Sequence, residues 1–209
     1  MQGNLPPARH YTLKLVVCFC VRGVISPMLS NLYLNEVDRM LERAKQNTRN
    51  GKYIHIEYAR FADDAVILVN AHVRNDWLLK ALAQRLREEF AKLHVQINEE
   101  KSRTVDLARG ESFGFLGFDF RRVRSLQGKW RAQYTPKLKK RTALLQTLRE
   151  VFRRYRSQPV NGVVAIINPI LRGWVNYFAI VHSSRSFQFV QRWVEVKIRR
   201  HRMRARSRQ

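Results

Sequence analysis

The sequence predicts an α+β fold in which a mixed region of strands and helices is followed by an all-helical region. Apolar and polar residues alternate from Ile54 to Tyr58, and residues 65–69 are all apolar, which indicates two neighbouring strands. Leucines and a phenylalanine recur at helical spacing between Leu79 and Leu93. From about residue 121 acidic side chains almost vanish, and helical patterns carry the basic ones.

Charge is concentrated in the second half of the chain. The 209 residues contain 40 Lys and Arg and 16 Asp and Glu, a net charge of +24. Residues 1–118 carry 17 basic and 13 acidic side chains, whereas residues 119–209 carry 23 basic and 3 acidic ones. A positive electrostatic field concentrated in one half of the chain favours binding of a polyanion, and nucleic acid is the expected partner. An anionic membrane surface is the alternative, but the basic tail does not form a single amphipathic helix.

Cys18 and Cys20 are too few for a zinc site or a disulfide framework. The apolar run at residues 15–21 is too short to cross a bilayer and lacks a following cleavage site. We therefore expect a cytoplasmic protein with no membrane partner. Residues 1–20 show no other pattern that predicts an element.

Ser26-Pro27 is typical of a helix start, with Ser as the N-cap and Pro in the first turn. Asn75 is a candidate cap for the helix that reaches Leu93, and residues 95–97 suggest a short strand. Residues 113–120 alternate aromatics with two glycines and predict a hairpin or bend. The apolar stripe of the first helix consists of Leu29, Leu32, Tyr33, Val37, Met40 and Leu41.

Helices are expected throughout the region beyond residue 136. Pro136 opens the first, Asn168-Pro169 breaks an apolar helix and starts the next, and a last helix lies near residues 185–200. The apolar stripe of the first consists of Leu138, Leu145, Leu148, Phe152 and Tyr155.

Asp63-Asp64 is the sharpest chemical feature, because it falls between two apolar strands. Adjacent carboxylates repel each other, so a hairpin tip carrying both is favourable where they face a divalent cation. Mg²⁺ prefers such oxygen ligands together with substrate phosphates, and two ions can clamp a phosphoryl transfer. The alternative is an ordinary polar turn, since Asp is common in turns.

Five segments place this pair in a wider context. In chain order they are Gly23–Leu34, Tyr58–Asp64, Asn98–Ser102, Phe115–Phe118 and Asn168–Phe178. Together they resemble the group II intron-encoded reverse transcriptases, also called maturases. The resemblance implies a partial reverse-transcriptase palm at residues 21–120, a thumb and maturase-specific RNA-binding domain at 121–209, and an unassigned segment at 1–20.

The resemblance also implies roles for residues of the palm. The RNA-directed DNA polymerase reaction would use Asp63 and Asp64 as ligands of a two-ion Mg²⁺ site, with Lys101 near the nucleotide phosphates. Contacts to template and nucleotide are implied for Gly23, Ser26, Pro27, Asn31 and Phe61. The primer grip would consist of Phe115, Leu116, Gly117 and Phe118.

RNA contacts in the maturase region are expected from basic side chains and from the polar ends of an aromatic segment, whereas Trp174 and Phe178 are favoured as core. The expected RNA-binding residues are Lys137, Lys139, Lys140, Arg141, Arg153, Arg154, Arg172, Asn176, Tyr177, Arg192, Arg199 and Arg200.

One departure from the family bears on activity. The family requires a further Asp upstream of the Gly23–Leu34 segment, but no Asp or Glu precedes Glu36. We therefore expect a truncated chain without fingers, an exposed palm edge, and weak or no polymerisation unless a complementing fragment or a second copy assembles with it. Expected partners are group II intron RNA and, if the enzyme is active, an RNA template with a DNA primer. The alternative is a catalytically inactive maturase remnant that binds intron RNA.

Overall fold

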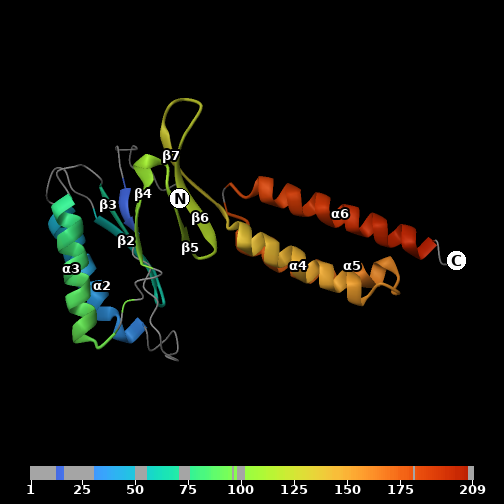
Figure 1. Cartoon of the computed structure of the whole chain (residues 1–209), viewed down its shortest axis with the longest axis horizontal. Helices are drawn as coiled ribbons and strands as arrows, with labels where there is room; N and C mark the ends of the chain where they lie inside the picture. The colour runs from blue at the N-terminus through green and yellow to red at the C-terminus, as the bar shows by residue number, and fades with distance from the viewer. Residues whose placement is uncertain are drawn as a thin grey trace, which may run out of the picture. The chain divides into compact units, whose positions relative to one another are not determined.

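The protein has an α+β architecture, as predicted, and its strands form two sheets. The computed structural model describes residues 13–16, 31–49, 56–70, 76–95, 97, 102–180 and 182–206. The chain divides into two compact units, which are described here one at a time (Figure 1). The first unit comprises Met1–Phe115 and Arg121–Ala132, and the second comprises Leu116–Phe120 and Gln133–Gln209.

A four-stranded sheet forms the centre of the first unit. Its order is β2 (Ile56–Phe61), β3 (Asp64–Asn70), β1 (Leu13–Val16) and β4 (Arg103–Asp106). Strand β1 pairs antiparallel with both β3 and β4, so β3 has a hydrogen-bonded neighbour on each side. Within the described residues, β2 and β4 are the two edge strands of this sheet. Strand β1 has only four residues, Leu13–Val16, which is too short a pattern to predict a strand from the sequence.

Two helices, α2 (Asn35–Arg49) and α3 (Asp76–Lys92), lie on the same side of this sheet (Figure 1). The predicted α3 stripe is confirmed through Leu82, Leu86 and Phe90, which are buried. The shared core also contains Leu34, Val37, Leu41, Ile56, Ala65, Ile67 and Val69.

The predicted stripe of the first helix is wrong in part. Leu32 and Tyr33 are exposed, whereas Leu34, Val37 and Leu41 are buried. Residue 34 is a turn between two helical stretches, and this break shifts the buried face of α2 relative to the residues before it.

The prediction of a short strand at residues 95–97 is wrong for the two described residues. Neither Val95 nor Ile97 lies in a strand, although both pack against the core of the first unit. The Val95 amide donates to the carbonyl of Phe90 at 2.9 Å, and His94 has a φ of 52°. Their apolar character therefore reflects the closing turn of α3 rather than strand pairing.

A second sheet has the order β5 (Ser112–Phe115), β6 (Phe118–Arg124) and β7 (Trp130–Pro136). The short 3₁₀ helix η2 (Leu107–Arg109) precedes it. The hairpin expected within residues 113–120 is confirmed as β5–β6. The β6–β7 hairpin was not predicted, although apolar and polar side chains alternate from Trp130 to Thr135. Pro136 ends β7 instead of opening a helix.

The second unit contains α4 (Leu138–Arg154), α5 (Val160–Phe178) and α6 (Ser184–Arg206). The chain reverses between successive helices, so α4 and α6 run in the same direction (Figure 1). Leu138 is exposed, contrary to the predicted stripe. Within the described ranges no helix has the length and apolar character needed to cross a membrane. The buried core of the bundle consists of Leu144, Leu148, Val163, Ile167, Val190 and Val194.

Pro169 does not separate two helices, so the predicted break is wrong. It lies inside α5, which continues to Phe178. A helical proline removes the hydrogen bond to the carbonyl four residues earlier. Here that carbonyl belongs to Ala165, and both Ala165 and Pro169 are on the exposed face, where water can replace the missing donor.

Candidate functional site

The acidic pair lies at the tip of the β2–β3 hairpin. Phe61 pairs with Asp64 as the last rung of the ladder, so Ala62 and Asp63 form a two-residue turn. Asp64 begins β3, and both carboxylate residues are half-buried. Ala62 has a φ of 53°, a left-handed conformation that costs a residue with a side chain roughly 1 kcal/mol. The predicted strand–turn–strand is confirmed, and it brings the two acids together.

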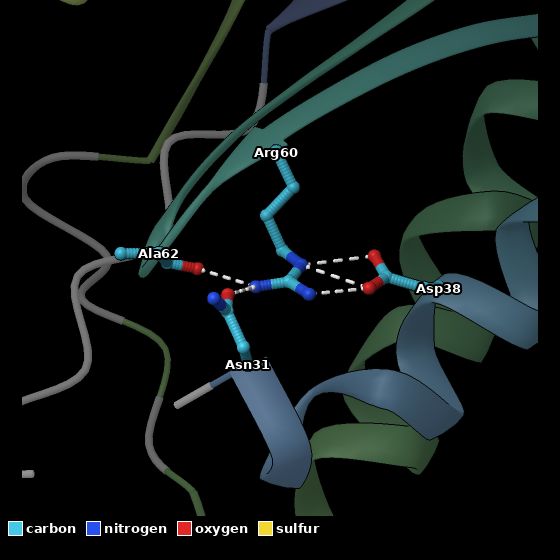
Figure 2. A network of polar contacts seen from close by, with 4 residues as sticks. All are labelled: Asn31, Asp38, Arg60 and Ala62. Carbon is cyan, nitrogen blue, oxygen red and sulfur yellow. Dashed lines mark hydrogen bonds and ion pairs between the residues drawn. The ribbon is translucent and has the colours of Figure 1, made fainter. Parts of the chain in front are cut away.

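Arg60 ties this turn to helix α2 (Figure 2). Its Nε donates to both carboxylate oxygens of Asp38, at 2.9 and 3.1 Å, and its Nη2 donates to Asp38 Oδ2. Its Nη1 donates to Asn31 Oδ1 and to the Ala62 carbonyl, each at 2.8 Å. The Arg60 and Asp38 side chains are 12% and 24% exposed, so the pair is partly shielded from water. Arg60 thereby fixes the peptide that precedes Asp63.

The surroundings of this network favour the protonated forms of Arg60, Tyr58 and Lys45. The hydrogen bond from Arg60 to Asp38 raises the pKa of the guanidinium. Burial raises the pKa of the Tyr58 hydroxyl, and the Asp38 charge adds to the effect. An ion pair of 2.8 Å with Glu57 raises the pKa of Lys45. These groups line or flank an open groove of about 290 Å³ between α2 and β2.

Sequence patterns did not identify the partnership of Asp38 and Arg60. The two residues are 22 positions apart, on a helix and a strand, and no local spacing links them. The predicted nucleotide contact Asn31 belongs to the same network, as an acceptor for Arg60. Because Asp38 is fully engaged with a guanidinium, it does not stand in for an upstream metal-binding carboxylate.

The residues present fit part of a divalent-metal site. Asp63 and Asp64 are adjacent carboxylates, the type of ligand that Mg²⁺ prefers. Among the described residues, no three or more His, Cys, Asp or Glu side chains gather closely enough to hold a metal ion. The ring of Phe61, a predicted template contact, is 64% exposed beside the pair. The remaining predicted residues Gly23, Ser26, Pro27 and Lys101 lie outside the described residues.

The predicted primer grip, Phe115–Phe118, forms the turn between β5 and β6. Leu116 and Gly117 occupy it with φ values of 47° and 81°. The Tyr177 hydroxyl donates to the Leu116 carbonyl at 3.0 Å, and the Lys137 amide donates to the Gly117 carbonyl at 2.9 Å. The start of α4 and the end of α5 therefore both hold this turn. The Tyr177 hydroxyl has a protein partner here, although its ring is exposed.

The predicted RNA contacts of the helical unit are spread over several faces. Lys137 and Arg141 are half-buried, and the Arg141 guanidinium lies 4.3 Å from the centre of the Phe189 ring. Trp174 packs against the helical core and Phe178 is buried, in agreement with their predicted core role. The other predicted contacts are exposed, namely Lys139, Lys140, Arg153, Arg154, Arg172, Asn176, Tyr177, Arg192, Arg199 and Arg200.

Two of these cations, Arg153 and Arg200, line one groove between α4 and α6. Residue counts along a helix could have indicated it, because the lining cations recur three, four or seven positions apart. The cations of this groove that were not predicted as RNA contacts are Arg149, Arg156, Lys197 and Arg204.

Comparison with known families gives two matches along the chain. Residues 22–120 match the reverse transcriptase (RNA-dependent DNA polymerase) family, and residues 141–209 match the group II intron maturase-specific domain. No curated protein matches the chain. The two matched regions follow each other in the order that the five sequence segments imply, and both point to RNA as a partner.

Proposed function

The chain belongs to the group II intron reverse transcriptase/maturase family, and we propose that its principal activity is to bind structured intron RNA and help it fold for splicing. The observation that carries this proposal is the coincidence of the maturase-specific match with the positive charge. Residues 141–209 match that domain, and residues 119–209 have a net charge of +20. A field of this strength favours dense phosphate such as that of folded RNA.

The charge would act mainly through the RNA backbone. A-form helices hide their base edges in a deep, narrow groove, so proteins recognise them by shape and phosphates. The exposed lysines and arginines of α4, α5 and α6 supply such contacts. Unpaired loops offer bases for stacking, for which the exposed ring of Tyr177 is a candidate.

We assign residues 21–120 to a partial palm and residues 121–209 to the thumb and maturase region. The β2–β3 hairpin, with its acidic tip, supports the palm assignment. The three-helix bundle after β7 supports the thumb and maturase assignment.

A second function, RNA-directed DNA polymerisation, is favoured by the geometry of the hairpin tip. Asp63 and Asp64 would hold Mg²⁺, which when bound stabilises the negative charge that develops on transferring phosphates. Lys101 would lie near the nucleotide phosphates, and Phe61 would contact the template. The 209 residues contain no Asp or Glu before Glu36. We therefore propose that polymerisation requires a carboxylate in addition to those of these 209 residues.

The maturase proposal is tested by RNA binding and splicing with the full chain. At low salt we expect tight binding of a folded group II intron RNA and weaker binding of an unstructured RNA of equal length. Addition of the protein should also lower the Mg²⁺ concentration at which the intron splices. Equal binding of both RNAs, or no change in splicing, would contradict the proposal.

The polymerase proposal is tested by Mg²⁺-dependent primer extension on an RNA template. We expect no extension by the purified chain. Robust extension that is lost in Asp63→Asn would show that the chain already has a complete active site and would overturn the requirement for a further carboxylate.

A further inference from the structure

A groove of about 200 Å³ lies between α4 and α6 in the second unit. Its lining contains cations from both helices and no carboxylate. The two α4 cations are four residues apart, and the α6 cations recur at intervals of three and four residues, which places each set on one helix face. The six lining cations are Arg149 and Arg153 on α4, Arg156 in the turn that follows α4, and Lys197, Arg200 and Arg204 on α6.

Gathering like charges in one groove is unfavourable for the isolated protein. Each cation repels the others, and the groove walls exclude part of the water that would screen them. The acidic residues of these two helices, Glu150 and Glu195, are absent from the lining, and the Glu195 carboxylate accepts a hydrogen bond from Gln191 at 2.9 Å. A bound polyanion would offset the repulsion.

Aromatic side chains within the lining and beside it contact some of the cations. The Phe152 ring meets Trp193 and His201 at centroid distances of 6.5 and 6.2 Å. The Arg149 guanidinium and the Lys197 ammonium lie 5.8 and 5.2 Å from the Trp193 ring centre. Such cation–π contacts lower the entropy that long side chains lose on binding.

The buried His201 holds the end of α6 in place on one side of the groove. His201 is 6% exposed, and its Nε2 lies 2.9 Å from the carbonyl oxygen of Gln158. This contact joins the last turns of α6 to the connection between α4 and α5. The two rows of cations are therefore held at a set spacing before any ligand binds.

The length of the rows of cations along the helices favours a chain of phosphates over a single phosphate group. The α6 cations span seven residues, from Lys197 to Arg204, which rise roughly 10 Å in a helix. A nucleic acid strand carries a phosphate about every 3.4 Å along its helix axis, so rows of this length span several successive phosphates. A single phosphate group would engage one end of the groove and leave the other cations unpaired.

We propose that the groove between α4 and α6 binds the phosphodiester backbone of RNA without reading its sequence. The inference rests on the proposed maturase function and gives that function one defined contact surface. It separates cations that are neighbours in sequence: Arg153 and Arg200 line the groove, whereas Arg154 and Arg199 do not.

Two double variants of the full chain test this inference. Arg153→Gln/Arg200→Gln removes two groove cations. Arg85→Gln/Arg87→Gln removes two exposed cations of α3 in the first unit, outside the basic helical region, and therefore changes the net charge equally. Thermal unfolding followed by circular dichroism checks that both variants remain folded.

Binding of one structured RNA is then measured between 50 and 300 mM salt. We expect the groove variant to bind about 10- to 50-fold more weakly near 150 mM salt, with a slope of log K against log salt smaller by about two. The control variant should bind within about threefold of the original chain. An RNA with the same base-paired structure and a different sequence should show the same loss.

Each contrary result has a distinct meaning. If both variants lose affinity equally, the cations act as a diffuse surface and the groove proposal is wrong. If inorganic pyrophosphate at equimolar concentration displaces RNA from the original chain but not from the groove variant, the groove binds a compact phosphate and the backbone proposal is wrong. If the original chain binds no RNA at low salt, the proposed maturase function itself fails.

Discussion

At the scale of single residues, the acidic hairpin depends on two unusual features next to the acids. Ala62 adopts a left-handed backbone that glycine would tolerate better. Arg60 compensates by donating to the Ala62 carbonyl while Asp38 anchors the guanidinium. Strained backbone that the surroundings hold in place is frequent at functional sites. The orientation of Asp63 is therefore set by residues that carry no catalytic chemistry themselves.

Arg60→Gln is expected to destabilise the protein by about 2 kcal/mol, because it leaves the partly shielded Asp38 carboxylate without its charged donor. The midpoint of urea unfolding measures the change. Arg39→Gln is the matched control, since it breaks the Arg39–Glu36 ion pair, whose side chains are 60% and 55% exposed. That change should cost less than about 0.5 kcal/mol. Equal effects of the two variants would mean that Arg60 does not support the turn.

Substitutions of Ala62 test the strain directly. Ala62→Gly should leave stability unchanged or raise it by up to about 0.5 kcal/mol, because relief of the left-handed backbone exceeds the added freedom of the unfolded chain. Ala62→Val should destabilise by more than about 1 kcal/mol, since a β-branched residue resists positive φ. Ala59→Val, at an exposed position of β2, is the control and should be tolerated. A stable Ala62→Val variant would contradict the inferred strain.

At the scale of elements, the hairpin turns and helix α5 show different uses of glycine. Gly117 has a φ of 81° in the β5–β6 turn, and an added Cβ would lie 3.6 Å from the Phe178 ring. Gly173 lies within α5, and an added Cβ would meet nothing within 4 Å. Gly117 is therefore required by the backbone, whereas Gly173 weakens its helix without a packing reason.

The two glycines should respond in opposite directions to alanine. Gly173→Ala is expected to stabilise the helical unit by about 0.5–1 kcal/mol, the difference in helix propensity. Gly117→Ala is expected to destabilise it by about 1 kcal/mol, because alanine must adopt a left-handed backbone. Thermal unfolding reports both changes. A Gly173→Ala variant that is more stable but binds RNA less tightly would indicate that the RNA backbone approaches α5 closely at this position.

At the scale of the whole molecule, the excess of basic residues and the acidic pair lie in different parts of the chain. The acidic pair lies on a sheet in residues with nearly balanced charge, whereas the basic excess lies beyond residue 118. RNA affinity should therefore survive changes at the acidic tip, although polymerisation would not.

Binding of structured RNA by the full chain should weaken steeply with salt. If six or more phosphates are engaged, we expect affinity to fall about 10³-fold or more between 50 and 200 mM salt. Asp63→Asn/Asp64→Asn is the control and should keep the same slope, because these residues do not contact backbone phosphates in RNA binding. A flat salt dependence would be inconsistent with an electrostatic maturase surface.

Local patterns were sufficient for elements whose partners are close in sequence. The alternation of β2, the apolar β3 and the leucine stripe of α3 specify their own buried faces, and the acidic turn between the strands follows from them. The sequence also predicted the helical character and the basic charge of the C-terminal half. The five ordered segments indicated the family, which the two family matches bear out.

Tertiary structure decided what depends on distant partners. Strand β1 is recognisable only by its pairing with β3 and β4, and the tie between Arg60 and Asp38 joins residues 22 positions apart. Pro169 stays helical because its missing donor falls on a face open to water, which sequence spacing does not reveal. The groove between α4 and α6 exists because two helices pack side by side. A sequence determines which side chains share one helix face, but packing determines which two faces meet.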